Sequence, residues 1–405
     1  MTRRVAVTGI GVIAAPGRTR PEFWDALVRG ESAIRPMRLV PEGSLRFSNA
    51  AEVSSYRPQD FFEGKDADML DRFAQFAVVA AREAVADAGV KITPELSARV
   101  GIVTGTSTGG QTSEDDQFRA LYADGRSRIH PLTIARTMAN AGSSAIAREW
   151  GIKGPSYTIS TACSSANHAI GHAFWMVRSG AVEMAIAGGA EAPFSLGFLK
   201  AWEAMRIVAP DTCRPFSKDR KGLILGEGAA MLVLEPLAHA RARGARVWGE
   251  IAGFGMSSDA HHLTQPLAEG AAMAMRSALR DAGDAPLEAV GYINAHGTGT
   301  LANDATETVA IREVFGAHAA KLMVSSTKSM HGHALGAAGA LEAAATLMAL
   351  HEAVLPPTAN YSEADPACDL DVIPNVARHG MEVEWALSNS FAFGGLNAVL
   401  AFRRP

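Results

Sequence analysis

A cysteine stands where an apolar run gives way to a helical pattern, within residues 159–166. The run ends at Ser160, small residues follow, and a helix is expected to begin at or just after Cys163. The first turn of a helix presents free N–H groups and the positive end of its dipole, which favour a thiolate. Most cysteines are simply small buried side chains, but this position favours a nucleophile that carries a covalent intermediate.

Two histidines and a lysine also follow apolar runs, in the second half of the chain. His296 lies in a glycine-rich loop, while Lys328 and His333 lie five residues apart at the next such junction. This spacing could orient a charge-sensitive reaction, although a single histidine is more often a hydrogen-bonded structural residue. Three histidine pairs could hold a metal, namely His331/His333, His261/His262 and His168/His172. No carboxylate or thiolate completes a set at conventional spacing, so no metal is expected.

A glycine pair, Gly394-Gly395, lies between Phe393 and Leu396 near the carboxyl end. Glycines permit a tight turn, and the turn could point a backbone N–H at a ligand. The neighbouring ring of Phe393 could act as a gate. A phosphate loop is not indicated, because no Lys-Ser/Thr follows in the required pattern.

Composition narrows the class of protein. The 405 residues are 48% apolar and 20% charged, which excludes a disordered, collagenous or disulfide-framework chain. The net charge is −4 without a dense basic run, so nucleic acid is not an expected partner. Three widely spaced cysteines, Cys163, Cys213 and Cys368, argue against disulfides and favour a reducing compartment. No signal peptide or bilayer-spanning run is found, so we expect a cytoplasmic protein with no membrane partner.

The apolar pattern predicts a mixed α/β protein. Strands are expected at residues 5–8, 99–104, 157–160, 184–188, 229–235, 249–254, 289–295, 322–326, 385–390 and 398–402. Helices are expected at residues 73–88, 132–150, 164–179, 237–243, 271–282, 304–315 and 335–351.

Two stretches of the chain echo each other. Residues 82–89 resemble residues 276–283, and each stretch is followed by a strand beginning Val-Gly and then by a Gly/Thr loop. Many α/β proteins connect a helix to a strand through such an Asp-Ala-Gly turn, so this feature alone is weak evidence. Four matched features in the same order favour a duplication. We therefore expect two halves, residues 1–250 and residues 251–405.

The segments around Cys163, His296, Lys328 and Gly394 resemble those of the β-ketoacyl-acyl carrier protein synthases. The resemblance includes residues 5–11, 214–216, 226–229 and 253–260. The resemblance spans nearly the whole chain and is closest to synthase II and to type II polyketide ketosynthases. Residues 164–171 also look like the nodulation-type ketosynthases. The resemblance implies an α/β protein with the duplicated αβαβα layered fold of the thiolase-like superfamily.

The resemblance also implies roles. Cys163 matches the nucleophile that accepts the acyl group, and the protein would be an acyltransferase that condenses this group with malonyl-acyl carrier protein by decarboxylation. His296 and His333 match the pair that binds the malonyl thioester, and Lys328 matches the lysine that supports them. The backbone N–H groups of Cys163 and Phe393 would form the oxyanion hole, with the Phe393 ring as the gate. Supporting positions are Glu342, Asp304, Glu307, Thr298 and Thr300.

Partners follow from the same resemblance. The substrate would arrive on an acyl carrier protein that brings its own phosphopantetheine, so no resident cofactor is expected. Docking would use Lys65, Arg126, Arg128 and Arg206. Asp66 and Asp68 dilute the basic character of residues 64–72, so docking would rely more on Arg206 and on the loop with Arg126 and Arg128. We expect a homodimer, or a heterodimer with a ketosynthase-like subunit, paired through the apolar residues 182–189.

The resemblance also implies that residues 105–111 reach the dimer interface and line the acyl pocket, which would then include Thr108 and Gln111. Their polarity suggests an unsaturated or partly polar chain. The alternative is that Thr108 and Gln111 bond to backbone across the dimer and the tunnel is an ordinary one. Three residues depart from the family pattern: Ala392, Leu396 and His331. Two alternatives remain. A non-catalytic chain-length-factor subunit is disfavoured because such subunits lack the nucleophile, and a biosynthetic thiolase would need a second catalytic cysteine that Cys368 does not match.

Overall fold

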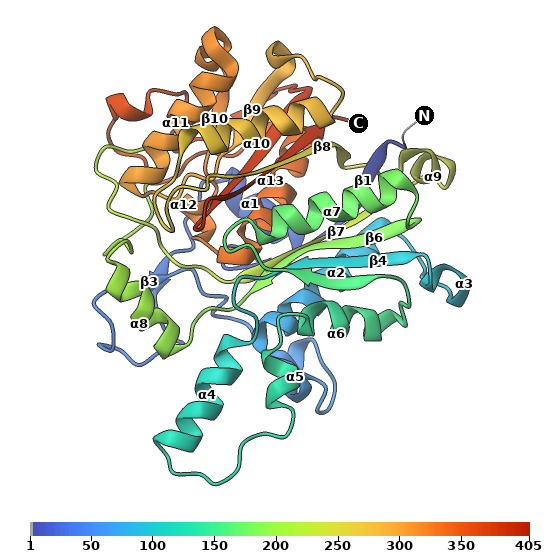
Figure 1. Cartoon of the computed structure of the whole chain (residues 1–405), viewed down its shortest axis with the longest axis vertical. Helices are drawn as coiled ribbons and strands as arrows, with labels where there is room; N and C mark the ends of the chain where they lie inside the picture. The colour runs from blue at the N-terminus through green and yellow to red at the C-terminus, as the bar shows by residue number, and fades with distance from the viewer. Residues whose placement is uncertain (1–2) are drawn as a thin grey trace.

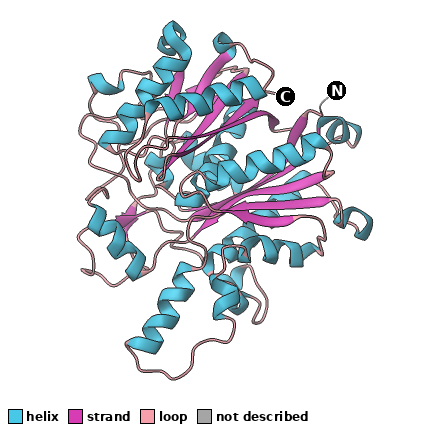
Figure 2. Cartoon of the chain, in the orientation of Figure 1, coloured by secondary structure: helices cyan, strands magenta, loops and turns pink. Residues whose placement is uncertain are grey.

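The computed structural model describes residues 3–405. Ten strands form one sheet in the order β10-β9-β13-β14-β8-β1-β7-β6-β4-β5 (Figures 1 and 2). They are β1 (Val5–Ala14), β4 (Val100–Gly105), β5 (Ser156–Ile159), β6 (Met184–Glu191), β7 (Gly228–Pro236), β8 (Gly249–Ser258), β9 (Val290–Asn294), β10 (Met323–Ser325), β13 (Trp385–Ala392) and β14 (Leu396–Arg403). Each corresponds to a strand expected from the sequence. Two short ladders lie apart from this sheet, β2 (Arg35–Pro36) with β3 (Asn49–Ala50) and β11 (Val354–Leu355) with β12 (Arg378–His379).

The two halves of the sheet repeat one topology. In each half the strands run, from the outer edge inward, third, second, fourth, fifth and first in chain order. In each half the three outer strands run parallel to one another. Each of the next two strands inward is antiparallel to the strand before it. Strands β1 and β8 pair across the middle and join the halves. The repeated order and direction identify a duplicated unit, and its second copy opens with β8 at Gly249.

Helices cover both faces of each half-sheet. The longer ones are α1 (Arg20–Val28), α2 (Arg72–Ala88), α4 (Gln111–Tyr122), α6 (Ala141–Trp150), α7 (Ser165–Ser179), α8 (Leu196–Met205), α10 (Ala268–Asp281), α11 (Leu301–Phe315) and α13 (Ala338–Glu352), and the short ones are α3 (Pro94–Ser97), α5 (Thr133–Thr137), α9 (Leu237–Ala242) and α12 (Lys328–His331). Helices α7 and α13 contact strands of both halves, whereas α2 packs on the first half alone and α10 on the second. The result is the αβαβα layering of the thiolase-like fold.

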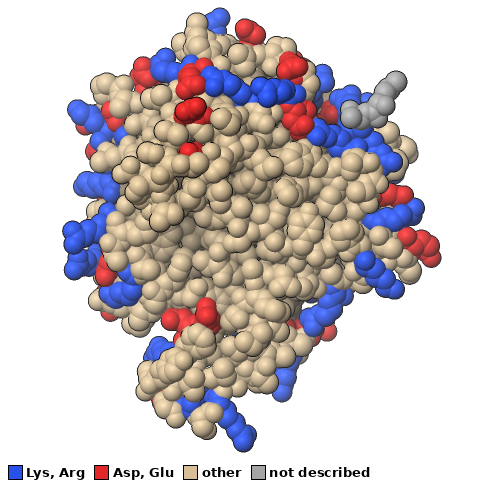
Figure 3. Space-filling view, viewed as in Figure 1, with Lys and Arg blue, Asp and Glu red and all other residues tan. Residues whose placement is uncertain are grey.

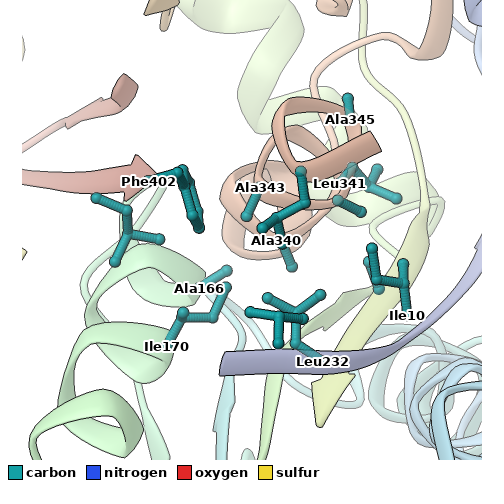
Figure 4. Packing of buried hydrophobic residues seen from close by; sticks show 14 of the residues in the cluster. Ile10, Ala166, Ile170, Leu232, Ala340, Leu341, Ala343, Ala345 and Phe402 are labelled. Atoms are coloured by element: carbon teal, nitrogen blue, oxygen red, sulfur yellow. The ribbon is translucent and has the colours of Figure 1, made fainter. Parts of the chain in front are cut away.

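Helix α13 lies at the centre of the molecule, and its residues 338–350 are all buried. Ala340, Ala343 and Ala345 pack with residues of α7 and of strands from both halves (Figure 4). A helix that is apolar all round is buried on every side. Small side chains on it allow a second helix and two half-sheets to approach closely.

A glycine in the first strand of each half lets a helix pack directly against the strand backbone. A Cβ on Gly11 of β1 would lie 2.0 Å from the carbonyl oxygen of Ala80 in α2. A Cβ on Gly255 of β8 would lie 2.2 Å from the carbonyl oxygen of Ala274 in α10. Each strand therefore needs glycine for its outer helix to lie directly against the backbone.

Two expectations about local structure were wrong. The helix expected over residues 132–150 is two helices, because Met138 adopts an extended conformation between α5 and α6. The strand over residues 182–189 cannot pair with a partner, since β6 lies inside the sheet between β4 and β7. The free edge of the first half is β5 instead. Within residues 3–405, no helix is both long and apolar enough to cross a bilayer.

We expect Gly11→Ala and Gly255→Ala each to lower the free energy of unfolding by about 1–3 kcal/mol, because the added methyl meets a helix backbone that cannot move aside. Chemical denaturation would measure the loss. Gly101→Ala in β4 is the matched control, since its Cβ would meet side chains and no backbone: the flexible end of Met176 at 3.1 Å and Val182 at an ordinary contact distance of 3.4 Å. Equal losses in all three variants would contradict the close-contact argument.

Candidate active site

A cavity of about 250 Å³ opens between the two halves of the chain. Cys163, His296 and His333 line it together, although they are far apart in the sequence. Its other walls are largely apolar and include Trp202, Met205, Ile207, Leu223, Phe391 and Phe393. The structure thus brings the sequence-predicted cysteine and both histidines into one site.

The duplication explains why these residues meet. Cys163 follows β5 and precedes α7, and Lys328 follows β10 and precedes α13. Strands β5 and β10 hold equivalent places in the two halves, and α7 and α13 are the two central helices. The beginnings of both central helices therefore lie at the same site. The turn before the thiol is strained, because Ala162 has a φ of +51°.

The side chain of Cys163 is buried at the cavity wall. Burial raises its pKa to about 11, and the Lys328 charge and the backbone N–H groups of Phe393 and Cys163 oppose this rise. The helix start therefore favours the thiolate as expected, but burial outweighs this effect, and the net shift of the thiol pKa is upward. Both N–H groups lie near enough to the sulfur to favour its anion.

Hydrogen bonds hold both cavity histidines in the tautomer that is protonated on Nε2. The Leu335 N–H donates to Nδ1 of His333 at 3.2 Å, and Nζ of Lys328 lies 3.4 Å from Nδ1 of His296. Since Nδ1 accepts in each ring, a neutral imidazole carries its proton on Nε2. Burial lowers both pKa values well below the usual range, and the charge of Lys328 lowers them further. The two rings, 5.4 Å apart between centroids, are two neutral N–H donors.

Lys328 and Glu342 form a fully buried ion pair behind the histidines. Lys328 opens the single turn α12, and Glu342 projects from the central helix α13. Burial raises the pKa of the Glu342 carboxyl, and the ammonium of Lys328 opposes this. The sequence-predicted partner of Lys328 is therefore its partner in the structure.

Two buried carboxylates shape the loop that carries His296. Glu307 accepts the backbone N–H groups of His296 at 2.9 Å and Gly297 at 2.8 Å. Asp304 accepts the N–H groups of Phe216 at 2.8 Å and of Gly299 at 3.2 Å. Neither carboxylate lines the cavity, so both act on the site through the loop. Thr298 and Thr300 do line it, and their hydroxyls lie 2.9 Å apart.

Phe393 lies at the tip of the hairpin between β13 and β14. Ala392 pairs with Leu396 across this hairpin, and Gly394 and Gly395 have φ values of +83° and +68°. The Gly394 N–H donates to the carbonyl of Leu263 at 2.8 Å. The glycine pair is thus the predicted turn, and Ala392 occupies an extended position that any residue can adopt.

Thr108 and Gln111 do not line the cavity. The Thr108 hydroxyl donates to the buried carboxylate of Glu191 at 2.8 Å, as does the Thr106 hydroxyl at 2.9 Å. Glu191 also accepts the N–H of Gly336 at 2.9 Å. The Thr108 hydroxyl is therefore satisfied inside the protein, and it does not argue for a polar acyl chain.

The predicted docking residues Lys65, Arg126, Arg128 and Arg206 are all exposed. Arg206 directly follows Met205, which lines the cavity, whereas Arg126 and Arg128 lie on the loop between α4 and α5 at the tip of a projecting arm (Figure 1). Arg72, the last residue of the segment 64–72, forms an ion pair with buried Glu227.

Sequence reasoning missed two contributors to the site. Trp202 lines the cavity, and its ring is 6.1 Å from that of Phe393 at an interplanar angle of 24°. Asp259 holds the hairpin by accepting a hydrogen bond from Asn397 at 2.7 Å and donating its own N–H to the Gly395 carbonyl at 2.8 Å. Asp259 lies in residues 253–260, which the family resemblance had singled out, so that motif was the available signal. No comparable signal marked Trp202.

The other cysteines lie outside the cavity. Cys213 and Cys368 are buried and free, and burial raises the pKa of each thiol to about 12. A second catalytic cysteine, as a thiolase would require, is therefore not supported. Among residues 3–405, no group of three or more His, Cys, Asp or Glu side chains is arranged to hold a metal.

Comparisons with known proteins agree with this geometry. The model of the β-ketoacyl synthase N-terminal domain matches residues 2–240, and that of the C-terminal domain matches residues 248–362. Nodulation protein E of Rhizobium sp. (strain N33) is 48% identical over 404 residues, covering 100% of both chains. The 3-oxoacyl-[acyl-carrier-protein] synthase 2 of Coxiella burnetii (strain RSA 493 / Nine Mile phase I) is 42% identical over 410 residues, covering 99% of both.

A solved structure, the ishigamide ketosynthase/chain length factor, superposes with a TM-score of 0.94 at 40% identity and covers 100% of both chains. The match of both domain models, the full-length relatives and the shared fold lead to one assignment. The chain belongs to the β-ketoacyl synthase family, the acyltransferases that carry out the condensation step of chain elongation.

Proposed function

We propose that this enzyme condenses an acyl group held on Cys163 with malonyl-acyl carrier protein to give a β-ketoacyl-acyl carrier protein. The reaction would serve fatty-acid or polyketide chain elongation. The observation that carries the proposal is the shared cavity, in which a buried thiol faces two neutral histidines that each offer an Nε2–H. The name of the Coxiella relative supports an acyl carrier protein as the substrate carrier.

In the loading step, the sulfur of Cys163 attacks the carbonyl carbon of an acyl thioester. A new C–S bond forms, the old one breaks, and the thiol proton leaves with the carrier thiol. Negative charge develops on the carbonyl oxygen, which the N–H groups of Cys163 and Phe393 would bind. This covalent step separates loading from carbon–carbon bond formation.

In the condensation step, the malonyl thioester loses carbon dioxide and becomes an enolate. Nε2–H groups of His296 and His333 would donate to the thioester oxygen, and Lys328 would keep both rings neutral. The enolate carbon attacks the acyl carbon on Cys163, a C–C bond forms, and the C–S bond breaks. The released thiolate regains its proton from water, which restores the free enzyme.

A second subunit would cover the arm and the free edge of β5. The arm, formed by α4, α5 and their connecting loop, carries six exposed large apolar side chains: Phe118, Tyr122, Ile129, Leu132, Ile134 and Met138. Figure 3 shows that charged residues gather around the border of one face and leave its centre almost free of them. Such a surface fits a stable partner. The matched ketosynthase/chain length factor supports a dimer with this chain or with a related subunit.

The remaining roles follow from the same chemistry. Phosphopantetheine would arrive on the carrier protein, so the enzyme needs no cofactor of its own. The three free cysteines suit a reducing cytoplasm. A non-catalytic chain-length-factor role is disfavoured, because the thiol and both histidines are present in one cavity.

Cys163→Ala is expected to abolish acylation and condensation, because only this thiol can carry the acyl group. Mass spectrometry of enzyme incubated with an acyl-carrier protein measures the acyl adduct. Cys368→Ala, which removes a buried thiol outside the cavity, is the control and should acylate normally. Cys163→Gln should still decarboxylate malonyl-carrier protein, since the histidines survive. An acyl adduct on Cys163→Ala at the normal rate would refute the nucleophile assignment.

His296→Ala and His333→Ala should each slow condensation by about 10²–10³-fold, the usual cost of removing one donor to a developing oxyanion. Loading should change far less, because neither ring is assigned to it. Single-turnover measurements of loading and of condensation on preloaded enzyme separate the steps. A loss of loading with unchanged condensation would reverse the assignment.

The two steps should respond differently to pH. The thiolate is the attacking form, and since the pKa of Cys163 is raised to about 11, its fraction rises with pH throughout the neutral range. Loading at subsaturating substrate should therefore accelerate by about tenfold per pH unit between pH 6.5 and 8.5. Condensation on preloaded enzyme should stay nearly flat there, because the lowered pKa values keep both histidines neutral. A loading rate that is already constant at pH 7 would contradict this.

A further inference from the structure

His331 is a buried histidine that the proposed chemistry does not use. Its side chain is fully buried, and both ring nitrogens have partners. Nδ1 lies 2.8 Å from the carbonyl oxygen of Gly332, and Nε2 lies 3.0 Å from the hydroxyl oxygen of Thr327. A carbonyl only accepts, so Nδ1 carries the proton, and Nε2 accepts the Thr327 hydroxyl proton.

These two partners flank the turn that carries Lys328. Thr327 immediately precedes α12 and Gly332 immediately follows it. A helix of four residues has too few internal hydrogen bonds to hold itself together. The imidazole of His331 links the two ends of the turn, because it bonds both to Thr327 before the turn and to Gly332 after it. The ring thus braces the turn at both ends.

The braced turn sets the geometry of the site. From α12 the Lys328 ammonium reaches Glu342 in one direction and Nδ1 of His296, at 3.4 Å, in another. His333 directly follows Gly332, and its backbone N–H donates to the Ile224 carbonyl at 2.6 Å. Movement of the turn would therefore displace the ammonium and one of the two imidazoles together.

The brace also reaches the other histidine loop. Nδ2 of Asn294 makes a longer contact, 3.5 Å, with the Thr327 hydroxyl oxygen. Asn294 ends β9, two residues before His296. The Thr327 hydroxyl donates its one proton to His331 and accepts from Asn294 through a lone pair, so it links the two residues. His331 is not among the residues that line the cavity, so it does not touch substrate.

The ring acts as a neutral brace and not as a proton carrier. Burial and the nearby Lys328 charge lower the pKa of His331 to about 3. A protonated ring would offer a second N–H to Thr327 and place another positive charge beside Lys328. The buried position of the ring beside Lys328 therefore keeps it neutral.

We propose that His331 is a positioning residue for condensation, which holds the turn bearing Lys328 and thereby sets the distances among Lys328, His296 and His333. This inference rests on the proposed function, because it assigns these three residues to the malonyl half-reaction. It makes His331 specific to one of the two chemical steps.

The test compares loading and condensation in variants of this brace. His331→Leu fills similar space without either hydrogen bond, and His331→Asn can keep the donor to Gly332 while losing the acceptor for Thr327. We expect His331→Leu to slow condensation on preloaded enzyme by about 10–100-fold and to change loading by less than about threefold. His331→Asn should restore part of the lost rate.

Thr327→Val tests the same link from the other side and removes only a hydroxyl, so it keeps the proposal testable if His331→Leu does not fold. It should slow condensation selectively, and adding it to His331→Asn should cost little more, because the shared hydrogen bond is already lost. Thr8→Val is the control, since it removes a buried hydroxyl bonded to Glu235 at 2.6 Å away from the cavity. It should lower stability without separating the two steps.

Equal slowing of loading and condensation in folded variants would reduce His331 to a structural residue and overturn the proposal. Normal condensation in folded His331→Leu and in Thr327→Val would overturn it as well. The unmodified enzyme is measured in parallel with malonyl-carrier protein. If it loads but never condenses, the proposed function fails, and that result is distinct from a failure confined to the His331 variants.

Discussion

A lysine buried without any exposure to water constrains the whole site. Removing an ammonium from water costs several kcal/mol even after the protein relaxes, so Lys328 needs compensation from Glu342 and from Nδ1 of His296. The same charge holds down the pKa values of both cavity histidines and opposes the effect of burial on Cys163. One ion pair therefore influences the protonation of the thiol and of both donors.

The duplicated fold is what allows that ion pair to form beside the thiol. Equivalent strands in the two halves lead into α7 and α13, and the shared central layer brings the starts of these helices together. Helix α13 contributes both the apolar contacts of the core and the single buried carboxylate of Glu342. This helix therefore serves both the core and the site: its alanines let both half-sheets pack against it, and Glu342 pairs with Lys328.

The sequence predicted all ten strands of the main sheet, because buried strands are short apolar runs bounded by turn residues. It also predicted Cys163, His296, Lys328 and His333 as a group, since each follows such a run. What it could not predict depends on contacts distant in the sequence. The Thr108 hydroxyl is satisfied by Glu191, 83 residues away, and the pKa of Cys163 is set by burial that no local pattern reveals. The break at Met138 and the cavity-lining Trp202 likewise depend on packing.

Burial has opposite effects on the pKa values of the two kinds of titratable group in this cavity. It raises the pKa of the thiol, which favours the protonated and less easily oxidised form of the sulfur. It lowers the pKa values of the imidazoles, so they remain neutral donors beside a lysine. Water kept away from the acyl thioester also cannot hydrolyse it before condensation. The rings of Trp202 and Phe393, inclined by 24° to each other, add apolar surface to the cavity wall beside these groups and so help to keep their surroundings at a low dielectric constant.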